Sequence, residues 1–197
     1  RLDAEASRIP PGSDGLVALD YFQGNRNPYK DPQARGALWG LTLRHTVPHI
    51  YRAFCEAVAY GVRLILDDLL EHGFSPTRIL AGGGGAKSPL WMQIHADCIG
   101  MPIRLAQEPE NTALGAAIWA GLGAGVFRSY QDAIESMVTL GDTIEPNPDV
   151  KPVYDFYYSR YVETYHALKE SMHSVVSFEE KGQCSGGSGG REGLCHC

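Results

Sequence analysis

The sequence has few basic residues and no long apolar run. Of its 197 residues, 17 are Lys or Arg and 23 are Asp or Glu, which gives a net charge of −6. This balance argues against a nucleic-acid partner or an anionic membrane partner, because either would need a basic face. The longest uncharged stretch, 111–127, falls short of the ~20 residues that span a bilayer. We interpret it as a buried helix.

Cysteine is also scarce, with five residues at irregular positions. An odd number without regular spacing argues against a disulfide framework. Cys55 and Cys98 lie singly in apolar segments, which is typical of small core residues. Residues 1–5 lack the apolar run of a signal peptide, so we expect a cytoplasmic protein and read the start as a truncation point.

The last residues of the chain are rich in Gly and Ser and end in Cys195, His196 and Cys197. Cys and His are the ligand types that bind a soft metal ion. The surrounding composition is typical of a flexible linker. We therefore predict a flexible tail over 179–197 and no metal site.

Glycine is in excess, with 23 residues. No internal repeat is visible, and alternating strand and helix patterns predict an α/β fold. Residues 1–14 are predicted to be a connector, and 21–46 is predicted to be a loop. Strands are expected at 15–19, 78–81 and 103–105, and helices at 48–72, 88–99, 111–123, 129–139 and 152–176. The tyrosines of the last helix are predicted to pack in the core.

Four consecutive glycines, 82–85, follow the strand at 78–81. Ser88 is expected to cap the next helix, with Pro89 at its first position. A strand, a bare glycine turn and a helix N-terminus together favour phosphates or nucleotides. The P-loop pattern fails, because Ala81 and Ala86 stand where it needs glycine. A tight packing turn remains the alternative.

The helix expected at 111–123 has small residues every fourth position: Ala113, Ala117, Gly121 and Gly125. One face of this helix therefore carries almost no side chain. Another helix, a strand or a flat ligand can approach its backbone closely. Asn111 or Thr112 is predicted to cap it.

Several segments together carry a family resemblance. Residues 36–41, a gap of seven, and then 49–56 closely resemble the second signature of the FGGY family of carbohydrate kinases, although Phe54 and Cys55 depart from the usual residues. Residues 24–36 resemble the segment that precedes this signature. Residues 82–88 resemble the family's nucleotide loop, and 111–117 its second adenosine-side helix. The motifs stand in the family's order.

The resemblance implies an actin-like, ribonuclease H-like fold of two lobes, with ATP between them. It implies transfer of the γ-phosphoryl group, with Mg²⁺, to a hydroxyl of a small sugar or polyol, and 24–36 favours a ketopentose. Residues 1–178 resemble only the C-terminal lobe, a mixed sheet flanked by helices. The N-terminal lobe, with the catalytic base, would be a missing partner. Asp20, Asp97 and Asp142 match no motif and are read as turn or surface carboxylates.

The resemblance also implies which residues bind the nucleotide. Gly83, Gly84, Gly85 and Ser88 match the nucleotide loop, and Lys87 either contacts phosphate or is solvated. Asn111, Ala113 and Gly115 would border the adenosine.

Two further expectations follow for the chain as a whole. A lobe without its partner would expose apolar surface and associate with itself, and on its own it would be inactive. The alternative is a non-catalytic nucleotide-binding module or a truncated actin-like ATPase fragment.

Overall fold

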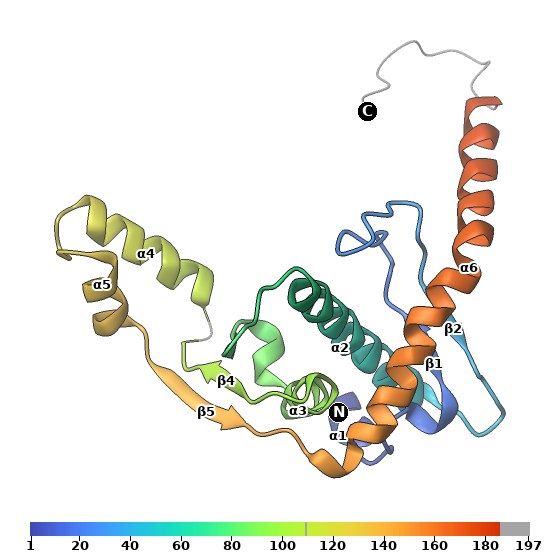
Figure 1. The fold of residues 1–197 in the computed structure, drawn as a ribbon, viewed down its shortest axis with the longest axis horizontal. Helices are drawn as coiled ribbons and strands as arrows, with labels where there is room; N and C mark the ends of the chain where they lie inside the picture. Colours follow the sequence, from blue (N-terminus) through green and yellow to red (C-terminus); the bar gives the residue numbers. More distant parts are fainter. Residues whose placement is uncertain (109, 186–197) are drawn as a thin grey trace.

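A computed structural model describes residues 1–108 and 110–185 and divides them into two regions (Figure 1). We call the first the core body; it contains both ends of the described chain and most of the buried residues. We call the second the outer arm; it spans 103–144 and extends to one side of the body in Figure 1. The core body contains α1 (Leu2–Ala6), β1 (Val17–Leu19), β2 (Ala37–Trp39), α2 (Val47–Glu71), α3 (Pro89–Ile99) and α6 (Lys151–Ser185).

The core body is built around β1, which is buried along its whole length. It pairs antiparallel with β2, Val17 opposite Trp39, and both α2 and α6 pack against it (Figure 1). Tyr154, Tyr161 and Tyr165 of α6 are almost completely buried in this core, which confirms the predicted role of the tyrosines there. Tyr21 packs edge-on against two of them.

The core body and the outer arm meet in a small mixed sheet. β3 (Ile79–Ala81) runs parallel to β4 (Ile103–Ala106), and β4 runs antiparallel to β5 (Leu140–Ile144). The helices α4 (Asn111–Gly123) and α5 (Tyr130–Met137) connect β4 to β5. A mixed sheet flanked by helices confirms the predicted fold class. Ser129 caps α5 by accepting a hydrogen bond from the backbone N–H of Asp132.

Residues 1–14, the predicted connector, are folded in the structure. They form α1 and the start of a 3₁₀ turn, η1 (Ser13–Gly15), and Ala6 and Ser13 are fully buried. The physical reason lies on α2, where Glu56 accepts hydrogen bonds from the backbone of Gly12 and the hydroxyl of Ser13. The segment is therefore part of the core body.

Three expectations about elements are wrong. The predicted loop 21–46 contains β2, whose three residues form a strand because they pair with β1. β5 was not expected, because its pairing with β4 reaches across more than thirty residues of the outer arm. The stretch 111–127 is not a buried helix, since Ile118 is the one buried residue of α4.

The final helix is longer than the prediction of 152–176. α6 continues to Ser185, so 179–185 is helical rather than part of a flexible tail. Glu179, Glu180 and Lys181 are good helix formers, and no proline interrupts them. Cys195, His196 and Cys197 lie outside the described residues. None of the described helices combines the length and apolar character needed to cross a membrane.

Candidate functional site

The glycine run joins β3 to α3 as an open turn. Gly83 has a φ of +84°, a left-handed conformation that favours glycine, and the 3₁₀ turn η2 (Gly84–Lys87) follows it. A Cβ added to Gly83 or Gly84 would meet no atom within 4 Å. The backbone of the loop is thus bare on that side. A tight packing turn would instead have neighbours there.

The N-terminus of α4 lies against this loop. A Cβ on Gly82 would collide with the side-chain amide of Asn111, the first residue of α4. The structure thus brings Gly82 and Asn111 together, although they are almost thirty residues apart in sequence. The prediction that Asn111 or Thr112 caps this helix is wrong. Glu110 holds the cap position, and its side chain makes no capping hydrogen bond.

The small-residue face of α4 remains largely open. Ala113 and Ala117 are exposed, and a Cβ on Gly115 would meet no atom within 4 Å. Gly121 is the exception, because a Cβ there would press on the ring of Phe127. Within the described residues, tight helix packing therefore explains Gly121 but not the rest of the face.

Ser88 caps α3 as predicted, accepting a 3.1 Å hydrogen bond from the backbone N–H of Trp91. Its hydroxyl proton goes to Asp3, whose Oδ2 lies 2.5 Å away. The other carboxylate oxygen of Asp3 accepts from Tyr51 of α2, also at 2.5 Å. The hydrogen bond from Ser88, followed by that from Tyr51, holds the pKa of Asp3 below its usual range.

Asp3 is a residue that sequence reasoning missed. It ties the end of the glycine loop to the signature helix α2, across 85 and 48 residues of sequence. No local pattern signals such a contact. Lys87, by contrast, is exposed at the end of η2.

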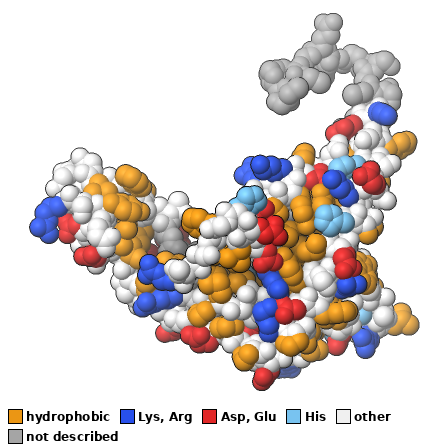
Figure 2. All heavy atoms as spheres, in the orientation of Figure 1, with side chains coloured by type: hydrophobic (Ala, Val, Ile, Leu, Met, Phe, Trp, Pro, Cys, Tyr) orange, Lys and Arg blue, Asp and Glu red, His pale blue; other side chains and the backbone are white. Residues whose placement is uncertain are grey.

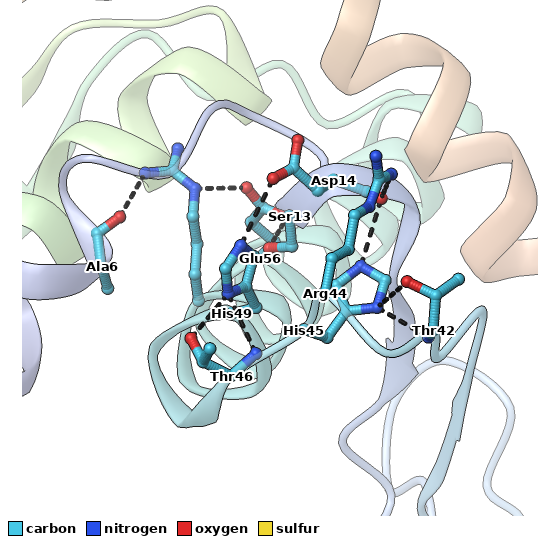
Figure 3. A network of polar contacts seen from close by, with 10 residues as sticks. Ala6, Ser13, Asp14, Thr42, Arg44, His45, Thr46, His49 and Glu56 are labelled. Carbon is cyan, nitrogen blue, oxygen red and sulfur yellow. Dashed lines mark hydrogen bonds and ion pairs between the residues drawn. The ribbon is translucent and has the colours of Figure 1, made fainter.

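A polar network fixes the start of α2 to residues 12–14 (Figure 3). At its centre is the buried pair of Arg52 and Glu56, with Nε and Oε1 2.9 Å apart. Burial raises the pKa of Glu56, and the charge of Arg52 opposes that rise. The guanidinium of Arg52 also donates to the carbonyl of Ala6 and the hydroxyl of Tyr154. The network holds four separate parts of the core body in one arrangement.

Two histidines of the signature region close the network at its exposed edge. His49 Nδ1 accepts from the backbone N–H of Thr46, so Nε2 carries the proton and donates to Asp14 Oδ2 at 3.3 Å (Figure 3). His45 and Arg44 both reach the carbonyl oxygen of Asp14. Of the residues that contact Asp14, His49 belongs to the signature, and Arg44 and His45 lie in the gap between its two halves.

The three aspartates set aside as base candidates have different surroundings. Asp20 accepts a hydrogen bond from Tyr161, and burial raises its pKa. Asp142 is exposed on β5. Asp97 is not a turn or surface carboxylate, because it is buried in α3 and accepts from Gln93 and from the backbone of Asn147.

Within the described residues, no group of three or more His, Cys, Asp and Glu side chains could hold a metal ion. A Mg²⁺ ion would therefore need ligands from the nucleotide phosphates.

Comparison with known proteins gives the same family as the motifs. The model of the FGGY family of carbohydrate kinases, C-terminal domain, matches residues 2–124. A ribulokinase of Bacillus licheniformis is 38% identical over 170 residues, which cover 83% of this chain and 31% of the relative. A xylulose kinase of Staphylococcus epidermidis is 32% identical over 167 residues, covering 85% of this chain and 33% of the relative.

A solved structure agrees. The xylulose kinase from Rhodospirillum rubrum superposes with a TM-score of 0.75 at 38% identity, over 87% of this chain and 34% of that one. The expected actin-like fold is thereby confirmed. The chain spans about a third of the length of the curated relatives it matches.

Proposed function

Because the chain belongs to the FGGY family of carbohydrate kinases, we propose that it forms the ATP-binding C-terminal lobe of a sugar kinase. The kinase transfers the γ-phosphoryl group of ATP to a hydroxyl of a small sugar, and the acceptor is a ketopentose. The names of the relatives, ribulokinase and xylulose kinase, support that choice. Its location is the cytoplasm, where ATP is available.

The observation that carries the proposal is the meeting of the bare glycine turn with the N-terminus of α4. Gly83, Gly84 and Gly85 leave room for phosphates near backbone N–H groups and the positive end of α3. Asn111, Ala113 and Gly115 border the adenosine from the other side. A planar ligand fits the open small-residue face of α4 better than a packed side chain does.

Ser88 and Lys87 have unequal roles in this proposal. The proton of the Ser88 hydroxyl is already donated to Asp3, and its oxygen accepts from Trp91. Ser88 therefore contributes chiefly by shaping the loop. Lys87 is exposed and long enough to swing toward a phosphate.

In phosphoryl transfer, positioning and charge stabilisation do most of the catalysis. This chain would hold the donor nucleotide in line, and the remaining two thirds of a relative's length would supply the acceptor site and the base that takes the hydroxyl proton. Mg²⁺ would arrive with the nucleotide phosphates and offset their charge. By itself the chain would bind nucleotide without phosphorylating sugar.

Calorimetry with ADP and a non-hydrolysable ATP analogue tests the proposal. The wild-type chain is expected to bind both, and Gly84→Val to lose that binding with its melting temperature unchanged, since a Cβ there meets nothing in the fold. Gly123→Val, at an equally open glycine at the end of α4, is the matched control and should bind normally. No binding by the wild-type chain, or equal binding by Gly84→Val, would contradict the proposal.

Sequencing the gene on the 5′ side of the codon for Arg1 tests the kinase assignment separately. An encoded lobe with an aspartate facing the nucleotide cleft is expected. A chain that binds nucleotide but has no such lobe would instead be a non-catalytic nucleotide-binding module.

A further inference from the structure

The loop at 29–35 and the second half of α6 enclose a hollow of about 490 Å³. None of its lining residues belongs to the glycine loop or to α4. The residues that bear on its chemistry are Tyr29, Lys30, Arg35, Lys169, His173 and Glu180. Three positively charged side chains, Lys30, Arg35 and Lys169, thus line one hollow on a chain whose net charge is −6.

Of the two acidic side chains that line this hollow, the buried one is already engaged. Asp31 is 7% exposed, and its Oδ2 accepts from the hydroxyl of Tyr165 at 2.9 Å and from Nε2 of His173 at 2.7 Å. Its Oδ1 accepts from the backbone N–H groups of Gln33 and Ala34. Asp31 therefore anchors His173 and the loop, and it does not pair with the lysines.

The cations of the hollow keep their charge available. Among the ion pairs of the described residues, none joins Lys30, Arg35 or Lys169 to a carboxylate. Arg35 donates through Nη1 to the carbonyl oxygens of Pro32 and Ala34, which orients its guanidinium and leaves Nη2 for a ligand. An oriented guanidinium matches phosphate oxygens better than a mobile ammonium does.

The loop is held in place before any ligand binds. Tyr29 stacks on Tyr165 with ring centroids 4.2 Å apart, and the backbones of Asn25 and Asp31 exchange two 2.8 Å hydrogen bonds. Lys30 has a φ of +52°, a left-handed conformation that a residue other than glycine keeps only where its surroundings impose it. Binding would therefore cost little ordering of the loop.

We propose that this hollow is a binding site for a small anion that carries phosphate groups. Lys30, Lys169 and Arg35 supply the positive charge, and His173, whose Nε2 is bonded to Asp31, forms part of the wall. Glu180, an exposed lining residue, repels an anion that extends toward it, so the ligand is small. The site is separate from the proposed nucleotide site and does not depend on it.

Calorimetry with pyrophosphate at constant ionic strength tests this site. The double variant Lys30→Ala with Lys169→Ala is expected to weaken pyrophosphate binding about tenfold or more, because two charge-assisted contacts are lost. Lys30 is exposed and Lys169 is half-buried, so the double variant should fold. Its melting temperature checks this. The matched control, Arg8→Ala with Arg128→Ala, removes the same charge elsewhere and should change binding less than twofold.

Two further variants locate the ligand. Arg35→Gln removes the oriented guanidinium and should weaken binding by several-fold, whereas Gly84→Val should leave it unchanged. Loss of pyrophosphate binding in Gly84→Val alone would place the anion at the glycine loop and overturn the proposal. Absence of wild-type binding up to 10 mM, or equal losses in the two double variants, would overturn it too.

A comparison of pyrophosphate with glycerol 3-phosphate distinguishes an inorganic ligand from a phosphate ester. Equal affinities would show that the site recognises the phosphate group alone. Tighter binding of the ester would show that the aromatic wall at Tyr29 contacts its organic part. Tight binding of neutral glycerol, with neither phosphate bound, would contradict an anion site.

Discussion

The core body and the outer arm bury their surfaces very differently. Seven residues of α2 are buried, and Glu56 among them is 1% exposed. In α4 only Ile118 is buried, while Trp119 on the same helix is 68% exposed (Figure 2 shows hydrophobic side chains at the surface of this part). The core body is thus stabilised by contacts within this chain. The outer arm presents apolar surface that the described residues do not cover, which is where the proposed adenosine side lies.

Removal of the central carboxylate of the core body should have the largest effect. Glu56→Ala leaves the guanidinium of Arg52 buried without its ion pair, and breaking a buried pair in this way costs about 3–5 kcal/mol. The free energy of unfolding from urea titration measures it. Glu5→Ala breaks the exposed pair with Arg1 and should cost less than about 0.5 kcal/mol. Similar losses for the two would remove the contrast between buried and exposed ion pairs.

The junction of the two regions should be next in sensitivity. In Gly82→Ala the new methyl group displaces Asn111, so we expect a loss of about 1–2 kcal/mol and weaker ADP binding. Calorimetry and urea unfolding measure the two effects. Asn111→Ala in the same chain removes the colliding amide and should restore stability. If Gly82→Ala alone were as stable as wild type, α4 would have to move freely relative to the loop.

The contact of Asp3 with the loop should contribute less, about 1 kcal/mol, because the carboxylate is only partly buried. Asp3→Asn should lower stability by that amount at neutral pH, whereas Asp142→Asn on exposed β5 should not. The pKa of Asp3 is lowered in the fold, so its contribution is complete above the ordinary aspartate range and is lost as pH falls below about 4. The difference between Asp3→Asn and wild type should therefore vanish in acid.

The outer arm should tolerate change best. Trp119 is exposed and contacts the ring of Tyr130 at a centroid distance of 5.6 Å, so Trp119→Ser should shift stability by no more than about 0.5 kcal/mol. Light scattering on the same variant measures self-association, which should fall as apolar surface is removed. A large loss of stability would show that the arm is held by its own aromatic contacts after all.

Local patterns predicted the elements that depend on local chemistry. The spacing of apolar residues gave α2, and Ser88 with Pro89 gave the start of α3, because a cap and a helix turn involve neighbouring residues. The glycine loop was predicted from its composition, and the family motifs located the proposed nucleotide residues. The roles of those residues in nucleotide binding stay predictions.

Distant contacts escaped prediction for a physical reason. Asp3 acquires its role from Ser88 and Tyr51, which no spacing rule connects to it. β2 and β5 are short, and their partners decide whether they are strands. The openness of α4 also could not be predicted, since an all-apolar sequence is equally typical of a buried helix.

The participation of α6 in the core has a consequence for the order in which the protein is made. Tyr161 bonds to Asp20 and Tyr165 to Asp31, across 141 and 134 residues of sequence. A ribosome therefore has to deliver nearly the whole chain before β1 and the 29–35 loop meet the tyrosines that cover them. Until then the earlier segments keep apolar surface exposed, and contacts of such long range slow the last folding step.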